Sequence, residues 1–272
     1  MRLQNAPLVH VLAQVVYSPI WELSERVKAF RAAIHPNDFP WVTEGQVHHV
    51  SVTDQAPPRV DIKPRWDFFS ADKTIGVMLT EEALVLQTTA YKTSEPFRNR
   101  LRSVLRALEE VAGVEFVQRI GLRYIDLVRI SPGERFGEYV HAGLLGFPWR
   151  EAPELQARGI GLRTEAISKT AHGIMAVRSS VLPPGQMLPG DLLPAVLRYP
   201  TAITEGQAGV PGLILDFDHF VQFDEVTFRF ESEGIVDVVN KLHGGLRTAF
   251  EAACTPHALE RWGPWINEEM KS

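Results

Sequence analysis

The sequence predicts an α+β fold in which a few long amphipathic helices pack on one face of an antiparallel sheet. Segments with the alternating pattern of strands come in runs, joined by short polar breaks, and do not alternate one by one with helices. Two stretches, 94–112 and the residues after Ser232, carry apolar residues at helical spacing. The 272 residues are 45% hydrophobic and 22% charged, which is typical of a globular protein with its own core.

The first predicted strand is 8–17, whose alternation puts one apolar set on a single face: Val9, Val11, Ala13, Val15 and Tyr17. Ser18-Pro19 has the pattern of a helix start, and apolar residues at helical spacing continue to Ile34. That helix is expected to end before Pro36, because the residue before a proline avoids helical dihedrals.

Five prolines in 36–64 predict irregular structure there, with a strand near 47–52. Residues 65–91 predict a meander of antiparallel strands. The clearest helix is 94–112, which Ser94 can cap and which is expected to stop at Gly113.

The second part of the chain repeats this order of strands and helix. A long strand is predicted at 115–130 and a final long helix after Ser232, followed by a short one that starts at Thr255-Pro256. Between them we expect a short helix at 136–145, strands at 160–169, 173–182, 213–222 and 225–231, and a loop at 183–212 with a helical piece near 190–197.

Both halves of the chain contain a run of strands followed by a long amphipathic helix. We therefore expect a single domain, 1–272, with two similar halves, 1–132 and 133–272, that share one sheet. Internal duplication of a β-rich unit is one interpretation of this pattern, and the tetrapeptide Ile-Gly-Leu-Arg recurs at 120 and 160.

Composition and missing motifs exclude several classes of protein. The net charge of −5 argues against a general nucleic-acid or membrane-surface binder, although a basic helix face at Arg98, Arg102 and Arg106 keeps a nucleic-acid accessory as an alternative. No dinucleotide, P-loop, zincin or hydrolase motif is present, and the single Cys254 excludes a cysteine zinc site. We see no signal peptide or membrane-spanning run and expect a cytoplasmic protein without a cofactor.

Strand 115–130 carries the first candidate site. Alternation places five residues on one face: Arg119, Gly121, Arg123, Ile125 and Arg129. Arginine pairs with carboxylate or phosphate groups through two parallel bonds, so this face could bind an anion. The alternative is that these arginines pair with acidic residues of neighbouring strands.

The second candidate site is the sequence Leu-Asp-Phe-Asp-His-Phe at 215–220. Alternation places Asp216 and Asp218 on one face, where they could act as acid and base, and His219 on the other. The two carboxylates could also hold a divalent cation if a third ligand came from elsewhere, with Glu165 as the candidate. Two carboxylates on one strand are too few ligands for a tightly held cation, so we expect no metal. Pairing with Arg119 and Arg123 would explain both candidate sites by structure alone.

Aromatic residues such as Tyr124 could line a pocket or belong to the core. The candidate ligand-binding residues are Arg119, Arg123, Tyr124, Asp216, Asp218 and His219.

Four segments resemble a sporadically distributed family of prokaryotic proteins of unknown function. They are Asn5 to Val9, Tyr91 with Phe97, Arg119 to Asp126, and Leu215 to Asp218 with Leu242, His243 and Phe250. The family pattern has asparagine at Asp126 and glutamate at His10. The resemblance implies no catalytic residues, and a patchy distribution implies an accessory role in a transferred system such as defence or toxin–antitoxin.

The leading hypothesis is a non-enzymatic protein that binds a protein partner or a small anionic ligand. The first alternative is an enzyme that binds an anionic substrate through Arg119 and Arg123 and uses Asp216, Asp218 or His219 for acid–base chemistry.

Overall fold

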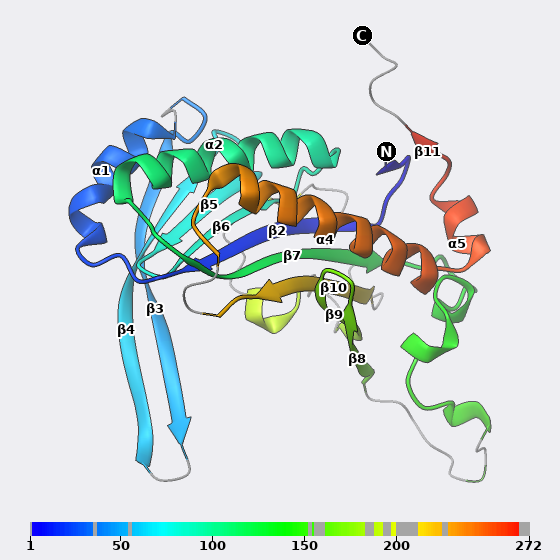
Figure 1. The fold of residues 1–272 in the computed structure, drawn as a ribbon. Coiled ribbons are helices and arrows are strands. Elements are labelled where there is room, and N and C mark those ends of the chain that lie inside the picture. Colours follow the sequence, from blue (N-terminus) through cyan, green and yellow to red (C-terminus); the bar gives the residue numbers. More distant parts are fainter. Residues whose placement is uncertain are drawn as a thin grey trace.

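The structure is a computed structural model, and it confirms the α+β fold. It describes residues 2–34, 37–53, 56–151, 154, 161–182, 188–192, 197–199, 212–224 and 228–266. Nine antiparallel strands form one open sheet, and four helices pack against it (Figure 1).

The strands of the sheet follow the order β3-β4-β5-β6-β2-β7-β10-β9-β8. Their bounds are β2 Leu8–Tyr17, β3 Trp41–Thr53, β4 Ala56–Phe69, β5 Ile75–Thr80, β6 Ala83–Thr88, β7 Val117–Val128, β8 Arg163–Thr170, β9 Gly173–Leu182 and β10 Gly212–Gln222. A separate pair, which the sequence did not reveal, joins β1 (Arg2–Leu3) to β11 (Trp265–Ile266) near the two chain ends.

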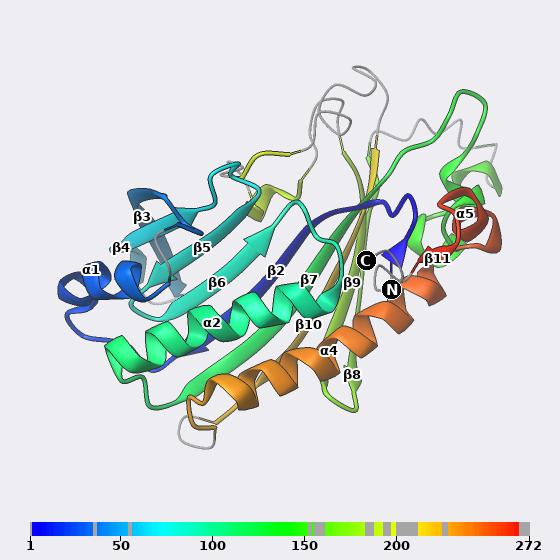
Figure 2. The same cartoon turned by 90° about the horizontal axis from the view of Figure 1, so that it is seen from above.

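The long helices lie together over one face of the sheet, as the view from above shows (Figure 2). The four helices are α1 Leu23–Ala33, α2 Ser94–Ala112, α4 Ser232–Ala253 and α5 Pro256–Arg261. Within the part of the chain that the structure describes, the opposite face carries no helix of this length. The β3–β4 hairpin and the β8–β9 hairpin both extend away from the helices, on either side of this helix-free face (Figure 1).

The two halves of the sheet follow the same topology outward from its centre. Strands β2 and β7 pair antiparallel. On one side β6, β5, β4 and an additional strand, β3, follow, and on the other side β10, β9 and β8. Each set ends in a long helix, and α2 and α4 lie side by side. In this arrangement β7 opens the second set, whereas the division near residue 132 assigns it to the first half. Origin by duplication stays a prediction.

The core lies between the sheet and the helices, and alternate residues of strands such as β2 point into it. Val11, Ala13, Val15 and Tyr17 of β2 are fully buried there, as predicted. Val9 is the exception, because a bulge between Leu8 and His10 shifts the alternation. Val9 instead joins a smaller apolar cluster on the helix-free face, with Ile125 and Leu127.

Two helix starts differ from the prediction. Ser18 and Ile20 still donate backbone hydrogen bonds, to the carbonyls of Phe116 and Glu81, so α1 begins only after Glu22 turns the chain with φ 64°. The N-cap of α2 is Thr93, and Ser94 is already helical. The expected stop at Gly113 is confirmed, since it adopts φ 61°.

The prediction of irregular structure at 36–64 is wrong, because β3 and β4 form a long hairpin there. β4 pairs with β5 only over Arg65–Phe69, so the residues before Arg65 have a strand on one side only. Prolines such as Pro64 are tolerated there, because no second strand needs their missing N–H.

Other short elements also differ. The predicted helix at 136–145 is two 3-10 turns, Phe136–Glu138 and Ala142–Leu144. Of the predicted helical piece near 190–197, Gly190–Leu192 is a 3-10 turn, and residues 193–196 lie outside the described residues. Of the predicted strand at 225–231, residues 225–227 lie outside the described residues, and Arg229 forms an isolated bridge with Phe116. Most of the loop at 183–212 also lies outside them.

Helix α4 contains adjacent glycines whose surroundings differ. A methyl group at Gly245 would lie 2.6 Å from Cε1 of His219, whereas nothing described lies within 4 Å of one at Gly244. Gly245 therefore allows α4 to approach the imidazole ring of His219 on β10, and Gly244 makes no such contact.

We predict opposite effects for the two alanine substitutions. Gly244→Ala should stabilise the protein by about 0.5–1 kcal/mol, because alanine is the better helix former. Gly245→Ala should destabilise it by about 1–3 kcal/mol, because the methyl group overpacks the His219 contact. Urea unfolding of both variants measures this, and equal effects would contradict the packing described.

Candidate functional site

The helix-free face of the sheet carries most of the predicted site residues. Arg119 and Arg123 of β7 and Asp216 and Asp218 of β10 all project from this face, because β7 and β10 pair in register and alternate together. The predicted pairing between these arginines and aspartates is confirmed.

Arg123 and Asp216 form the most enclosed ion pair. Nε of Arg123 lies 2.8 Å from Oδ1 of Asp216 and Nη2 lies 2.7 Å from Oδ2, so the pair is bidentate. The side chain of Asp216 is only 4% exposed and that of Arg123 13%. The outer edge of the guanidinium bonds a second carboxylate, Asp191, at 2.5 Å.

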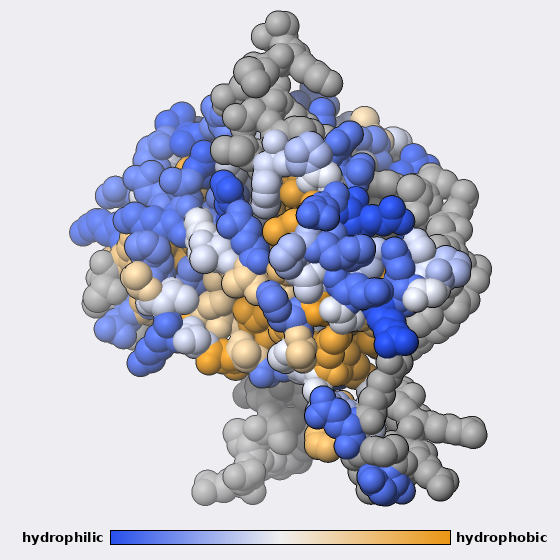
Figure 3. Space-filling model, turned by 90° about the vertical axis from the view of Figure 1, so that its right-hand side faces the viewer, coloured by the Kyte–Doolittle hydropathy of each residue, from blue (hydrophilic) through white to orange (hydrophobic). Residues whose placement is uncertain are grey.

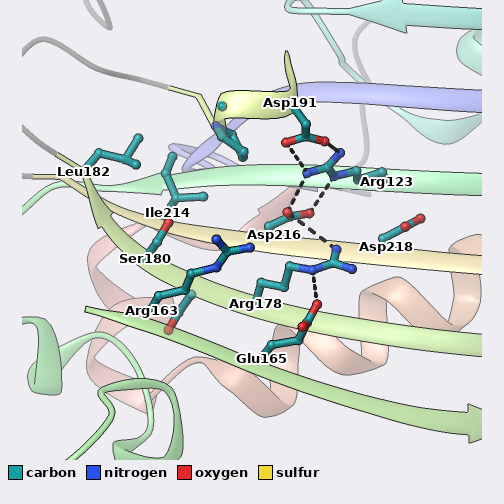
Figure 4. Close-up of a pocket in the computed structure, with 13 residues that line it drawn as sticks. Arg123, Arg163, Glu165, Arg178, Ser180, Leu182, Asp191, Ile214, Asp216 and Asp218 are labelled. Atoms are coloured by element: carbon teal, nitrogen blue, oxygen red, sulfur yellow. Dashed lines mark hydrogen bonds and ion pairs between the residues drawn. The ribbon is translucent and has the colours of Figure 1, made fainter. Parts of the chain in front are cut away.

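Further charged residues extend this pair across β9 and β8, as Figure 4 shows. Arg178 of β9 lies 3.8 Å from Asp216 and donates to Glu165 of β8 at 2.5 Å. Positive and negative side chains therefore alternate along one row. In order, the row is Glu165, Arg178, Asp216, Arg123 and Asp191.

Arg119 lies beside this row and is held by three groups. Its guanidinium donates to Gln14 at 2.5 Å, lies 3.3 Å from Asp218, and stacks 4.4 Å from the ring centroid of Phe220. A methyl group at Gly121 would lie 2.7 Å from Nη1 of Arg119. The space that Gly121 leaves is thus filled by Arg119 itself.

Two adjoining hollows follow this row, with volumes of about 600 Å³ and about 540 Å³. Both are lined by Arg123, Asp191 and Asp218, and together we call them the charged trough. Its charged lining comprises five arginines (Arg65, Arg119, Arg123, Arg163, Arg178) and five carboxylates (Asp67, Glu165, Asp191, Asp216, Asp218). Among the described residues, Arg163 has no ion-pair partner.

The local electrostatics follow from burial and pairing. Burial alone would lower the pKa of Arg123, but Asp216 and Asp191 outweigh it and raise that pKa. For Asp218 burial prevails, and its pKa is raised although Arg119 and Arg123 oppose the shift. For Asp191 partial burial alone would raise the pKa, but the hydrogen bond and the charge of Arg123, with smaller contributions from the backbone and Arg178, together lower it. Arg123 and Asp191 therefore both stay ionised at neutral pH.

Two of the predicted site residues lie on the other face of the sheet. The hydroxyl of Tyr124 donates to that of Tyr91 at 2.8 Å, under α4. His219 lies 3.0 Å through Nδ1 from the carbonyl of Leu242 and 2.9 Å through Nε2 from Thr170. The structure therefore does not bring His219 together with Asp216 and Asp218.

The sequence analysis missed Asp191, which lines the charged trough, and His10, which lies on the same face of the sheet outside that lining. His10 of β2 is 3% exposed, its Nδ1 lies 2.6 Å from the hydroxyl of Tyr199, and its Nε2 has no hydrogen-bond partner in the described part of the chain. Burial and the charge of Arg123 lower the pKa of His10 to about 4. Asp191 lies in the loop of 183–212, where spacing gave no signal for a contact with β7.

Asp126 marks the end of β7 on the helix-covered face. Burial, with a contribution from the charge of Asp216, raises the pKa of Asp126 to about 8. It lines a small pocket of about 80 Å³ together with Tyr91, Tyr124 and His243. The free Cys254 is buried.

Within the described ranges, no group of three or more histidine, cysteine, aspartate or glutamate side chains is placed to hold a metal ion. No described helix is long and apolar enough to cross a membrane. The side of the molecule with α5 and β11 is mostly hydrophilic, with hydrophobic side chains gathered at its lower middle (Figure 3).

Comparison with protein families and with curated proteins gave no match. The resemblance to a sporadically distributed family therefore stays a prediction.

Substitution of Arg123 should lower the free energy of unfolding far more than substitution of Asp191, the carboxylate on its outer edge. Arg123→Ala leaves Asp216 buried beside the more distant Arg178, so we expect a loss of about 3 kcal/mol. Asp191 is 59% exposed, and Asp191→Ala should cost less than about 1 kcal/mol. Denaturant unfolding compares the two, and similar losses would contradict the buried pair.

A second prediction concerns the buried His10. Because its pKa is about 4 in the folded protein and 6.5 in the unfolded chain, protonation favours unfolding as the pH falls from 6.5 to 4. Relative to His10→Gln, the wild type should therefore lose roughly 3 kcal/mol over this range. The exposed His141 provides the control, and His141→Gln should track the wild type in urea unfolding at each pH. If the difference in free energy of unfolding between wild type and His10→Gln does not change with pH, the lowered pKa of His10 is refuted.

Proposed function

We propose that this chain is a non-enzymatic binding protein, and that the charged trough binds an anionic group at Arg123. The group is a carboxylate or phosphate, carried by a small ligand or by an acidic segment of a protein partner. The observation that supports this most is the position of Asp191. It comes from outside the sheet and already presents a carboxylate to the outer edge of Arg123.

The carboxylates on the two edges of the Arg123 guanidinium differ in how readily they can be displaced. The inner edge bonds Asp216, which belongs to the neighbouring strand and is buried. The outer edge bonds an exposed carboxylate, and exposed ion pairs contribute only ~0.2–1 kcal/mol. An external anion can therefore replace Asp191 at little cost while Arg123 stays anchored.

The surroundings of Arg123 favour an anion of modest size. Arg178 and Arg163 line the same hollow of about 600 Å³, and Arg163 has no ion-pair partner among the described residues. Ligand pockets have volumes of roughly 300–1,000 Å³. Replacement of Asp191 by a single external carboxylate would leave the charge balance of the trough unchanged.

The arrangement supports binding more than the alternatives. Acid–base chemistry would need a free carboxylate near His219, but Asp216 and Asp218 face arginines and His219 lies across the sheet. Nucleic-acid binding would need an open basic helix face. Arg102 and Arg106 of α2 instead pair with Glu233 of α4.

The resemblance to a sporadically distributed prokaryotic family adds a biological setting to this proposal. A binding protein without catalytic groups fits an accessory role in a transferred system such as defence or toxin–antitoxin. The cytoplasm is the location proposed for it.

Asp191→Asn should strengthen anion binding, because the competing carboxylate is lost while the shape of the loop is kept. We expect the affinity for citrate and for inorganic phosphate to rise about two- to fivefold, the equivalent of an exposed ion pair. Isothermal titration of wild type and variant measures this. A glutamate-rich peptide tested in parallel separates a protein partner from a small ligand.

Glu233→Gln is the matched control, because it frees Arg102 and Arg106 outside the trough with the same change of charge. It should leave anion affinity as in the wild type. The proposal fails if Asp191→Asn binds none of the probes more tightly, or if Glu233→Gln shows the same gain.

A further inference from the structure

The outer edge of β8 is one of two open edges of the sheet. β8 pairs with β9 on one side, and no described strand pairs with it on the other. All but one of its eight residues are exposed, and Ile167 near its middle is 64% exposed. Proteins usually protect such an edge, because its free N–H and C=O groups can pair with another strand.

The hydrogen bonds to β9 determine which backbone groups of β8 are free. The hairpin closes with Thr170 opposite Gly173 across a two-residue turn, and Val181 donates to the carbonyl of Leu162, which lies opposite it. In an antiparallel pair the residues that bond the neighbour alternate with those that do not. Even-numbered residues therefore bond β9, and the N–H and C=O groups of Glu165, Ile167 and Lys169 point outward.

The sequence of this edge is complementary to itself in the antiparallel direction. With Ile167 opposite Ile167 of a second copy, Glu165 lies opposite Lys169, Ala166 opposite Ser168, and Thr164 opposite Thr170. The outward-pointing residues of the two copies then face one another, as a hydrogen-bonded ladder requires. Opposite charges directly across two strands are stabilising, and like charges are not.

We propose that β8 is a dimer interface, at which two copies of this chain pair antiparallel about Ile167. Three residues of each copy, Glu165, Ile167 and Lys169, exchange six backbone hydrogen bonds across the two-fold axis. Two Glu165–Lys169 pairs flank the contact between the two Ile167 side chains. A closed two-fold pair also covers the β8 edge of both copies at once.

The dimer would join the helix-free faces of the two copies. Glu165, Ile167 and Lys169 project from the same face as Arg178 and Asp216, because they share the alternation of β9 and β10. Glu165 already ends the row of charges in the charged trough. The inference goes beyond the proposed function and does not depend on it.

The contact is small, so the dimer is expected to be weak. Stable interfaces bury more than about 1,000 Å² in total, and an eight-residue edge buries less. Sedimentation velocity of the full chain, from low micromolar to several hundred micromolar, should show a rise from 30.5 kDa toward twice that mass.

Ile167→Pro and Lys169→Glu should each stay monomeric over this range. The proline removes an outward N–H without breaking a bond to β9, and the glutamate places like charges opposite one another. Lys28→Glu, an exposed position on α1 with the same change of charge, should dimerise as the wild type does. Circular dichroism verifies that each variant is folded.

A mixture of two variants tests the register itself. Glu165→Lys alone and Lys169→Glu alone each repel their own copies, but together each presents the charges that the other needs. The mixture should therefore associate although neither variant does by itself. A wild type that stays monomeric at every concentration, folded Ile167→Pro and Lys169→Glu variants that dimerise normally, or a mixture that stays monomeric would each overturn the proposal.

Discussion

The ion pair between Arg123 and Asp216 is the interaction on which the helix-free face depends. Strand alternation fixes both side chains on this face, and burial leaves neither of them free to turn into solvent. A buried charge is tolerated only with a partner, so β7 and β10 must keep the register that brings the two together. A slip by one residue would instead place Arg123 against the apolar core under the helices.

The two faces of the sheet therefore differ: one is an apolar packing surface and the other is charged. Under the helices, alternation supplies an apolar core, and the polar residues that enter it make internal bonds, as His219 does with Leu242 and Thr170. On the helix-free face, charged side chains bond one another across four strands and leave two adjoining hollows. Asp191 is the member of this network that comes from a loop and is exposed. In the function we propose, it is the member that an external anion replaces, because this leaves the buried Asp216 paired with Arg123.

Much of this arrangement could be predicted from local sequence. Alternation placed Arg119, Arg123, Asp216 and Asp218 correctly, because period-two spacing settles the face of a strand. It could not reveal the bulge that turns Val9 and His10. It also could not reveal the hairpin of β3 and β4, because prolines disfavour a strand only where strands pair on both of its sides, and the sequence does not show how many strands pair with it. The sequence could not indicate Asp191, because its contact with Arg123 joins residues 68 positions apart and Asp191 lies in a loop without periodicity. The face assigned to His219 was correct, but its inclusion in the site rested on chain proximity to Asp218.

A double-mutant cycle between Arg123 and Asp216 tests the central claim most directly. The free energy of unfolding would be measured for Arg123→Met, Asp216→Leu and the double variant. Each single variant leaves one charge with only its second partner, Asp191 for Arg123 or the more distant Arg178 for Asp216, and should lose about 3 kcal/mol. The double variant removes both charges and should lose much less than the sum. A coupling energy of at least ~2 kcal/mol is therefore predicted. Additive losses would contradict the account, because they would mean that Arg123 and Asp216 do not stabilise one another.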